Sequence, residues 1–468
     1  MAVEVQRKPK KERRRKAVPL HFLPVEERIG NFNEVNLGYL TEEEVLSEAE
    51  RCLSCRKPKC VEACPAHFNA RDMIAAMKEG NLEEAAEFVN NFYCFPSSFN
   101  RICPAFCQDA CVVGKKGDPI QILNLKRYLA DHYVKRLDPV PPTGKKIAVI
   151  GAGPAGLTVA HDLALKGHSI TVFEKFNVVG GMLAVGIPEY RLKNELLTKE
   201  VMRLEEIGVE FKFGVKFGED ITADELFQQG YHAIFIGHGA HKPKFMKIPG
   251  EDLEGVMHAI DFLREVALGQ RKTAGKKVVV VGGGDVAIDA VRVSWRLGAD
   301  ARIVYRRTRE EMPATKEEVE ATIEEGIEII YLTNPTRIIG ENGKVVGIEV
   351  VKMELGEPDE SGRRRPIPIP GSEYVIECDM VIEAISQEPE YDYLEEQDFE
   401  LSRWHTLEVD PETYMTSVYG VFAAGDNVTG PKTAIEAIAG AKKAAENIHR
   451  FLSGSSMEPE EHPEVAAV

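Results

Sequence analysis

Cysteine spacing between residues 52 and 111 constrains this chain more than any other feature of its sequence. Eight of the nine cysteines fall in this interval. The first group reads Cys52-x2-Cys55-x4-Cys60-x3-Cys64-Pro65, and the second reads Cys94-x8-Cys103-Pro104-x2-Cys107-x3-Cys111. Runs of this kind, with a proline after a cysteine, are typical of thiolate ligands to iron–sulfur clusters. The sequence therefore predicts two clusters, which carry electrons one at a time.

Length and composition narrow the class of protein. The 468 residues predict about two to four domains. A net charge of −17 argues against a nucleic-acid partner. We expect no membrane span, because no apolar run reaches the required length. The N-terminus lacks the apolar segment of a secretory signal, and cysteines at ligand spacing then favour the reducing cytoplasm over a disulfide framework.

Turn and charge signals divide the chain into segments. Residues 1–40 form an N-terminal arm whose basic stretch, 7–16, is either a solvated arm or a contact for an acidic partner subunit. Residues 41–140 read as short helices alternating with cysteine loops, and Thr41 with Glu44 predicts a capping box at the first of them. A proline-rich linker follows at 139–144. We expect residues 453–468 to be a disordered tail.

The first nucleotide-binding fingerprint follows the linker. A predicted strand at 146–150 leads into Gly151-Ala152-Gly153-Pro154-Ala155-Gly156, a helix and a second strand ending at Glu174. The glycines permit a tight turn, close approach of a pyrophosphate and close packing of helix on strand. The pyrophosphate is expected at the helix N-terminus, and Glu174 is expected to accept hydrogen bonds from a ribose.

Two further motifs indicate that this dinucleotide is FAD. Gly180-Gly181-Met182 comes shortly after Glu174, and a predicted strand at 421–424 ends in Gly425-Asp426. The second motif resembles the flavoprotein pattern in which an aspartate holds the ribityl chain and a helix, here beginning near Thr433, faces the flavin. The FAD domain would then be split into 145–270 and 389–452.

The second fingerprint lies between these halves, in a predicted domain at 271–388. It reads Gly282-Gly283-Gly284-Asp285-Val286-Ala287, again between a strand and a helix. Arg306 takes the place of the ribose-binding acid, with Arg307 beside it. Two guanidiniums would bind a 2′-phosphate, so the site is predicted to take NADP(H). Alternatively, these arginines form surface ion pairs with Glu310 or Glu311.

With these motifs in place, the chain resembles the glutamate synthase small (β) subunit family. Its relatives include the N-terminal part of dihydropyrimidine dehydrogenase, the large subunit of NADH-dependent reduced ferredoxin:NADP oxidoreductase, and sulfide dehydrogenase subunits. The resemblance covers about residues 35–452 and rests on CLSCRKPKC, RICPAFCQDAC, GAGPAGL, GGMLAVGIPEYRL, VVVVGGGDVAIDA, VYRRTREEMPA and AAGDNVTGPKTAIEAIAGAKKAA. It implies an α/β protein with an all-helical Fe–S domain ahead of a glutathione-reductase-like pair of dinucleotide-binding domains, and it implies FAD, NADP(H) and two [4Fe–4S] clusters.

The resemblance also implies site residues. The segment 185–191 looks like the family's flavin-lining loop, with Arg191 a candidate partner for the cofactor's polar atoms. His238 is either a flavin neighbour or a structural histidine. The residues expected to contact FAD, beyond the fingerprint and Glu174, are Lys175, Gly181, Met182, Ile187, Arg191, Gly239, Gly425, Asp426, Thr433 and Ala434.

The cluster ligands are expected to cross between the two cysteine groups. On the family pattern, Cys52, Cys55 and Cys60 share the first cluster with Cys111, whereas Cys64, Cys103 and Cys107 hold the second. Relatives often supply the last ligand from a Glu or Gln, but that position is here Lys126. The candidates that remain are Cys94 and Gln121. Otherwise Cys94 is a buried inert thiol and the cluster lacks a fourth protein ligand, which would favour a [3Fe–4S] form.

These expectations combine into a function. Hydride transfer between NADP(H) and FAD needs positioning rather than a protein acid or base, and the flavin would exchange single electrons with the clusters. The partner would be a glutamate synthase large subunit, a second flavoprotein or Fe–S subunit, or ferredoxin. Alternatives are a stand-alone glutamate synthase-like or sulfide/polysulfide reductase, a disulfide reductase, and a zinc-stabilised scaffold. A disulfide reductase needs a cysteine pair, yet residues 112–468 contain only Cys378.

Overall fold

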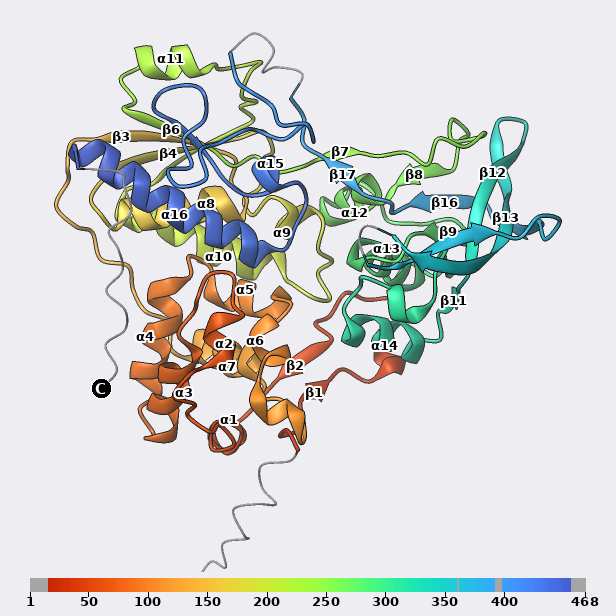
Figure 1. The fold of residues 1–468 in the computed structure, drawn as a ribbon, viewed down its shortest axis with the longest axis horizontal. Helices are drawn as coiled ribbons and strands as arrows, with labels where there is room; N and C mark the ends of the chain where they lie inside the picture. The colour runs from red at the N-terminus through yellow and green to blue at the C-terminus, as the bar shows by residue number, and fades with distance from the viewer. Residues whose placement is uncertain (1–15, 360–361, 392–397, 456–468) are drawn as a thin grey trace, which may run out of the picture.

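The computed structural model describes residues 16–359, 362–391 and 398–455. A helical domain lies against the first nucleotide-binding domain, and the second nucleotide-binding domain lies to one side of both (Figure 1). Most of the basic stretch 7–16 and most of the predicted tail lie outside the described residues. Helix α16 (Ala434–Ser453) ends at the start of that tail.

The helical domain consists of short helices joined by cysteine-bearing loops, as the sequence predicts. The capping box of Thr41 and Glu44 is present at the start of the first helix. The helices are α1 (Glu42–Ala49), α2 (Lys59–Glu62), α3 (Ala70–Lys78), α4 (Leu82–Phe92), α5 (Pro96–Ile102), α6 (Phe106–Asp109) and α7 (Ile122–His132), with the 3-10 turn η2 (Val112–Lys115).

The described part of the N-terminal arm is ordered against two domains. Strands β1 (His21–Phe22) and β2 (Asn36–Gly38) pair antiparallel on either side of the turn η1 (Val25–Glu27). Val35 belongs to the apolar core of the second nucleotide-binding domain. Arg28 is buried and its Nη1 lies 3.3 Å from Oε1 of Glu325 in that domain. The arm is therefore a strap that ties the helical domain to the second nucleotide-binding domain.

The first nucleotide-binding domain is built on a five-stranded parallel sheet. Its strand order is β18-β6-β3-β4-β5. The strands are β3 (Lys146–Ile150), β4 (Ser169–Glu174), β5 (Glu210–Phe213), β6 (Ala233–Ile236) and β18 (Val421–Ala423), and the helices are α8 (Pro154–Ala164), α9 (Met182–Val185), α10 (Asn194–Met202), α11 (Ala223–Gln228), α15 (Asp426–Thr429) and α16. The edge strand β18 comes from the end of the chain, so this sheet combines two distant segments.

The second nucleotide-binding domain repeats this plan. Its parallel sheet has the order β11-β10-β9-β16-β8. The strands are β8 (Val256–His258), β9 (Lys277–Val281), β10 (Asp300–Val304), β11 (Glu328–Ile330) and β16 (Met380–Glu383), with helices α12 (Ala259–Ala267), α13 (Asp285–Arg296) and α14 (Lys316–Glu324). Because β8 pairs with β16, this sheet begins before residue 271, the expected start of the domain.

Two smaller sheets complete this half of the molecule. An antiparallel sheet projects from the second domain (Figure 1) and consists of β12 (Thr333–Glu341), β13 (Lys344–Pro358), β14 (Arg364–Pro368) and β15 (Tyr374–Glu377). The short strands β7 (Lys242–Pro243) and β17 (Gln387–Glu388) pair antiparallel where the chain passes between the two nucleotide-binding domains. These strands form a two-stranded connection between the domains.

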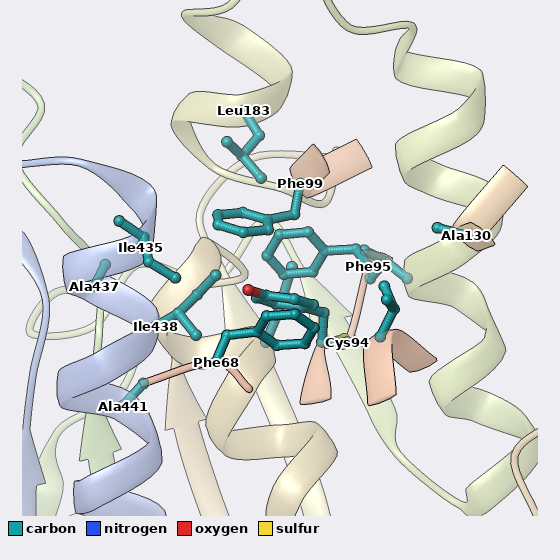
Figure 2. Close-up of a cluster of buried hydrophobic side chains, with 14 of the residues drawn as sticks. Phe68, Cys94, Phe95, Phe99, Ala130, Leu183, Ile435, Ala437, Ile438 and Ala441 are labelled. Atoms are coloured by element: carbon teal, nitrogen blue, oxygen red, sulfur yellow. The ribbon is translucent and has the colours of Figure 1, made fainter. Parts of the chain in front are cut away.

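One apolar core joins the helical domain to the first nucleotide-binding domain. Phe68, Phe95 and Phe99 of the helical domain belong to the same buried cluster as Leu183 and Ile438 of the other domain. Figure 2 shows these side chains converging between α16 and the helices of the Fe–S domain. Burying large apolar side chains contributes about 1.5–3 kcal/mol each, so the two domains share a packed interface rather than a loose linker.

Candidate cofactor-binding sites

A single cleft connects the predicted sites. It has a volume of about 1930 Å³ and lies between the two nucleotide-binding domains. Its walls include Gly151 and Glu174 of the first fingerprint, Gly282 and Arg306 of the second, and Cys103 of the helical domain. The fold therefore places two dinucleotide motifs and one cysteine around one continuous space.

The first fingerprint has the backbone that a pyrophosphate site requires. Gly151 has φ +95°, and a Cβ there would lie 2.8 Å from the carbonyl oxygen of Gly237. A Cβ on Gly156 would lie 1.9 Å from the carbonyl oxygen of Gly151. A Cβ on Gly153, in contrast, would make only an ordinary van der Waals contact, 3.9 Å from the Cα of Gly181. Gly153 precedes α8 without a side-chain cap, so backbone N–H groups at this helix start face the cleft and fit an anion.

Glu174 holds the turn beside this helix. Its two carboxylate oxygens accept hydrogen bonds of 2.8 Å from the backbone N–H groups of Ala152 and Phe176. Burial raises the pKa of Glu174, and these N–H groups oppose the shift. Each carboxylate oxygen has two acceptor positions, so Glu174 can shape the loop and still accept a ribose hydroxyl from the cleft.

The Gly180-Gly181-Met182 motif packs directly on the fingerprint. The N–H of Gly180 donates to the carbonyl oxygen of Ala152 at 2.7 Å. Gly181 has φ +55°, and a Cβ there would lie 2.9 Å from the Cα of Gly153. The motif therefore lets two backbones meet beside the pyrophosphate position. Other predicted FAD-side residues in the cleft wall are Pro154, Ala155, Lys175, Met182, Ile187, Gly239, Thr433 and Ala434.

Asp426 lies at the start of α15 on the same wall. Burial raises its pKa to about 6, and its carboxylate accepts a hydrogen bond of 3.1 Å from the N–H of Lys432. Gly425, with φ +87°, precedes it. Thr433 and Glu436 form a capping box at the start of α16. This places a carboxylate and a helix N-terminus next to the first fingerprint, as the sequence motif predicts.

The structure adds to the role expected for Arg191. This residue lines the cleft, but its guanidinium donates to Asp289 on α13 at 2.8 Å and lies 3.4 Å from Glu318 on α14. The hydroxyl of Tyr190 also donates to Asp289, at 3.1 Å. Arg191 thus also joins the two nucleotide-binding domains, a role that the sequence did not predict, and its contact with cofactor atoms stays a prediction.

A buried cluster of charges extends this junction. Glu325 accepts hydrogen bonds from Arg292 and Arg296 at 2.7 and 2.9 Å, and it also pairs with Arg28 of the arm. Burial opposes ionisation of Glu325, yet the two arginine hydrogen bonds lower its pKa to about 2. The Arg296 guanidinium lies 3.9 Å from the centre of the Tyr190 ring. Arg28, Tyr190 and Glu325 are far apart in sequence, so no local motif predicts that they meet.

The second fingerprint has the same construction as the first. Gly282 has φ +148°, and a Cβ there would lie 2.3 Å from the carbonyl oxygen of Ala384. A Cβ on Gly283 would lie 2.4 Å from the Tyr305 ring, whereas the position at Gly284 has no neighbour closer than 4.0 Å. Asp285 accepts a hydrogen bond of 3.0 Å from the N–H of Thr315, and Val286 lines the cleft. This loop also fits a pyrophosphate.

The two arginines after β10 have different surroundings. Arg307 is only 4% exposed, pairs with Asp359 at 2.6 Å and donates to the carbonyl oxygen of Arg364 at 2.8 Å. It therefore anchors the β13–β14 hairpin through Asp359 rather than through Glu310 or Glu311. Arg306 is exposed and lines the cleft. Burial and the charges of Arg307 and Arg363 lower the pKa of Arg306.

Sequence reasoning missed Arg363. It belongs to the run Arg363-Arg364-Arg365, which lies 57 residues beyond Arg306. The hairpin brings Arg363 to the cleft wall beside Arg306. Asp359 also lies near Arg306 and raises its pKa. Two guanidiniums on the cleft wall can still donate charge-assisted hydrogen bonds to a phosphate. The arginine run was the available signal, but only the hairpin shows where it lies.

The first cysteine set surrounds one small cavity. Cys52, Cys55, Cys60 and Cys111 all line it. Burial raises the pKa of Cys60 to about 11, and neighbouring Cys52 and Cys111 add to the shift. Among the described residues, no three His, Cys, Asp or Glu side chains converge closely enough for one metal ion. Four thiols are the ligand set of a [4Fe–4S] cluster.

The second cysteine set lies between the first set and the cleft. Burial raises the pKa of Cys107 to about 12, and the ammonium of Lys126 opposes this shift. The pKa of the Cys107 thiol is raised further by the nearby thiols of Cys103, Cys64 and Cys60. Three thiols of the predicted second cluster are therefore neighbours, and Cys60 of the first set is close to them.

Cys94, a candidate fourth ligand, belongs to different surroundings. Burial raises the pKa of Cys94, and the charged groups that act on it are Glu200, Asp162, Lys442 and Arg203 of the first nucleotide-binding domain. Figure 2 shows Cys94 within the apolar core between the domains. This placement favours a buried thiol over a ligand, because helix packing and not the cluster surrounds its sulfur.

Comparisons with known proteins agree with this architecture. Residues 145–441 match the family model described as pyridine nucleotide-disulphide oxidoreductase. Residues 28–137 match the model described as dihydropyrimidine dehydrogenase domain II, 4Fe-4S cluster. The fold and sites thus define a nucleotide-dependent oxidoreductase with an iron–sulfur domain. The chain belongs to the pyridine nucleotide-disulphide oxidoreductase family.

Several curated relatives are more specific. The chain is 39% identical over 438 residues to the NADP(+)-dependent formate dehydrogenase subunit beta of Moorella thermoacetica, covering 87% of this chain and 62% of that protein. It is 38% identical to the NADPH-Fe(3+) oxidoreductase subunit beta of Geobacter sulfurreducens, covering 92% and 69%. It is 35% identical to the glutamate synthase [NADPH] small chain of Azospirillum brasilense, covering 93% and 95%. The expected resemblance to glutamate synthase small subunits is confirmed.

Solved structures support the fold. FprA from Mycobacterium tuberculosis aligns with a TM-score of 0.56 at 19% identity, covering 67% of this chain and 85% of FprA. Thioredoxin reductase from T. acidophilum aligns with a TM-score of 0.51 at 21% identity, covering 66% and 99%. The prediction of an N-terminal iron–sulfur domain followed by a pair of dinucleotide-binding domains is confirmed. None of the helices in the described ranges is both long and apolar enough to span a membrane.

Proposed function

We propose that this chain moves electrons between NADP(H) and a partner protein through FAD and two [4Fe–4S] clusters. The observation that carries the proposal is the single cleft whose walls include both fingerprints and Cys103. FAD, when bound, supplies the exchange between hydride transfer and single-electron transfer. The protein's part is to place the two nucleotides and the nearer cluster around one space.

NADP(H) is assigned to the second fingerprint. The open position at Gly284 fits its pyrophosphate, and the corner formed by Arg306 and Arg363 fits its 2′-phosphate. Guanidinium groups bind phosphate by charge-assisted hydrogen bonds. This corner replaces the pair expected from sequence, because Arg307 is held by Asp359.

FAD is assigned to the first fingerprint. Glu174 would hold the ribose and Asp426 the ribityl chain, while the starts of α8 and α16 face the phosphates and the flavin. No side chain is needed as an acid or base. His238 is a cleft residue whose pKa is lowered to about 4 by burial and the charge of Lys175, so it stays neutral near pH 7 and suits a structural role.

The cysteine sets define an order of electron transfer. Cys103 of the second set lines the dinucleotide cleft, whereas the first set has its own cavity. The thiol of Cys60 on α2 is close enough to raise the pKa of Cys107 on α6, so the two sets are adjacent. Electrons from FAD would reach the second cluster first and the first cluster next.

The first cluster is proposed as the exit toward a partner. Leu53, beside Cys52, is 45% exposed. Five exposed residues near this loop and η2 are basic, namely Arg56, Lys57, Lys59, Lys115 and Lys116, whereas the exposed acidic residues nearby are Glu62, Asp109 and Asp118. Two of the relatives are named as β subunits and one as a small chain, which supports a partner subunit. We propose an acidic electron-transfer subunit or carrier in the cytoplasm.

An anaerobic titration tests the proposal. Purified protein with FAD bound is mixed with NADPH or NADH while the flavin absorbance is followed. NADPH should bleach the flavin at lower concentration than NADH. Bleaching by NADH alone would overturn the nucleotide assignment, and no bleaching by either would overturn the proposed function.

A further inference from the structure

The site of the second cluster contains a buried lysine. Lys126 on α7 is 2% exposed. Its Nζ lies 5.1, 5.3 and 5.5 Å from the ring centres of Phe68, Tyr93 and Phe99. Three aromatic faces within about 6 Å form a cage for a cation. The ammonium of Lys126 is therefore held in place beside the thiols of Cys103 and Cys107.

Tyr93 gives this site a second polar group. It is 2% exposed, and its hydroxyl is buried with no hydrogen-bond partner among the described residues. Burial raises the pKa of Tyr93, and the neighbouring thiols of Cys103, Cys64 and Cys107 add to that effect. A buried hydroxyl without a partner is costly, so a group bound among the neighbouring thiols would give this hydroxyl an acceptor.

The two candidate fourth ligands have other partners. Cys94 has Glu200 and Asp162 as its charged neighbours. The side-chain oxygen of Gln121 is 3.5 Å from the side-chain nitrogen of Gln108. The charge of Lys126 lowers the pKa of both Cys103 and Cys107. The three thiols therefore share their site with a lysine and a phenol, two side chains that can donate hydrogen bonds.

We propose that the second cluster is bound by three thiolates alone, and that Lys126 and Tyr93 occupy its fourth face as hydrogen-bond donors. The inference rests on the proposed second cluster. A cluster gains negative charge on reduction, so a fixed buried cation and donors to its sulfurs stabilise the reduced form. Lys126 is a positioning residue that makes the cluster nearest the flavin easier to reduce, and one iron lacks a protein ligand.

The test measures the midpoint potential of the second cluster by EPR-monitored redox titration. At a fixed applied potential, Lys126→Met should lower the ratio of reduced to oxidised second cluster by about tenfold or more. The reason is that a positive charge in a low-dielectric site stabilises the reduced cluster by at least this factor. Lys126→Arg should retain most of the wild-type ratio. Tyr93→Phe should lower the ratio by a smaller factor.

Lys442→Met is the matched control. The Lys442 Nζ lies 4.5 Å from the centre of the Phe92 ring and pairs with Asp162 at 3.0 Å. The charge of Lys442 lowers the pKa of Cys94. The variant removes a similar aromatic-packed lysine that does not face the cluster, so the second-cluster potential should not move.

Iron content distinguishes a failure of this inference from a failure of the two-cluster proposal on which it rests. A protein with a single cluster, whose iron content Cys103→Ala leaves unchanged, would refute the two-cluster proposal itself. Two clusters with unchanged potential in Lys126→Met would refute only the role of Lys126. A nitrogen hyperfine coupling lost in Lys126→Met would show that the lysine nitrogen is a ligand and would also overturn the inference.

Discussion

The guanidinium of Arg191 donates a hydrogen bond of 2.8 Å to the carboxylate of Asp289. This contact connects the loop after α9 in the first nucleotide-binding domain with α13 in the second. Burial raises the pKa of Asp289 to about 6, and Arg191 opposes the shift. The pair fixes how the two fingerprints face each other, which is the geometry that hydride transfer requires.

Removing Arg191 should therefore weaken both stability and electron transfer. Arg191→Met leaves Asp289 buried without its cation, which we expect to cost about 3–5 kcal/mol in free energy of unfolding. Urea denaturation measures the loss, and stopped-flow flavin reduction should slow. Tyr190→Phe, which removes only the 3.1 Å hydroxyl contact, should have a smaller effect. Equal stability of Arg191→Met and wild type would contradict the interdomain role.

The nucleotide preference should depend on two arginines from distant segments. Arg306→Ala and Arg363→Ala should each raise the Kd for NADPH about tenfold or more, since hydrogen bonds to charged groups contribute about 1.5–3 kcal/mol. The Kd for NADH should stay nearly constant. Arg302→Ala is the control, because Arg302, on strand β10 ahead of Arg306, pairs with Asp300. If Arg306→Ala binds NADPH as wild type does, the 2′-phosphate assignment is wrong.

Two cysteine substitutions should give opposite results. Cys55→Ser removes a thiol from the first cavity and should lower the iron content and abolish one EPR signal. Cys94→Ser changes a buried thiol in the interdomain core and should leave iron and both signals in place. Iron and sulfide analysis with EPR distinguishes them. Loss of the second-cluster signal in Cys94→Ser would restore Cys94 as a ligand.

Glu383 should make stability depend on pH. It is 0% exposed at the end of β16, and burial together with the Glu251 carboxylate raises its pKa from 4.5 to about 7. A raised carboxyl pKa means that the folded state holds the proton longer than the unfolded state. Stability should therefore fall as pH rises from about 4.5 to 7, by roughly 3 kcal/mol at 1.36 kcal/mol per unit.

The matching variant is Glu383→Gln, which should lack this part of the pH dependence and be more stable than wild type at pH 7. Unfolding by urea at several pH values provides the measurement. Glu377→Gln, at a surface ion pair with Lys277, serves as the control. Parallel pH profiles for Glu383→Gln and wild type would contradict the assignment.

Local signals explain what the sequence predicts well. The Thr41 capping box, the glycine turns at Gly151 and Gly282, and the Gly425-Asp426 motif all depend on neighbours within a few residues. Their geometry is encoded where it is used, because a turn or helix start is decided by backbone conformation and nearby hydrogen bonds. These elements form in the structure where they were expected.

Long-range contacts explain the rest. Arg191 finds Asp289 on another domain, and Arg363 reaches the cleft only because β13 and β14 form a hairpin. Cys94 had suitable spacing, yet packing between domains surrounds it with Glu200 and Asp162. The arm was expected as a separate segment, but Val35 and Arg28 are buried in the second nucleotide-binding domain. No local pattern specifies such partners.

The most direct test of the central claim is low-temperature EPR of the purified protein after anaerobic reduction, first by NADPH and then by a strong reductant. We expect flavin reduction by NADPH and, in the fully reduced protein, two distinguishable cluster signals. The second-cluster signal should be lost selectively in Cys103→Ala. A single cluster signal in the fully reduced wild-type protein, unchanged by Cys103→Ala, would contradict a two-cluster relay.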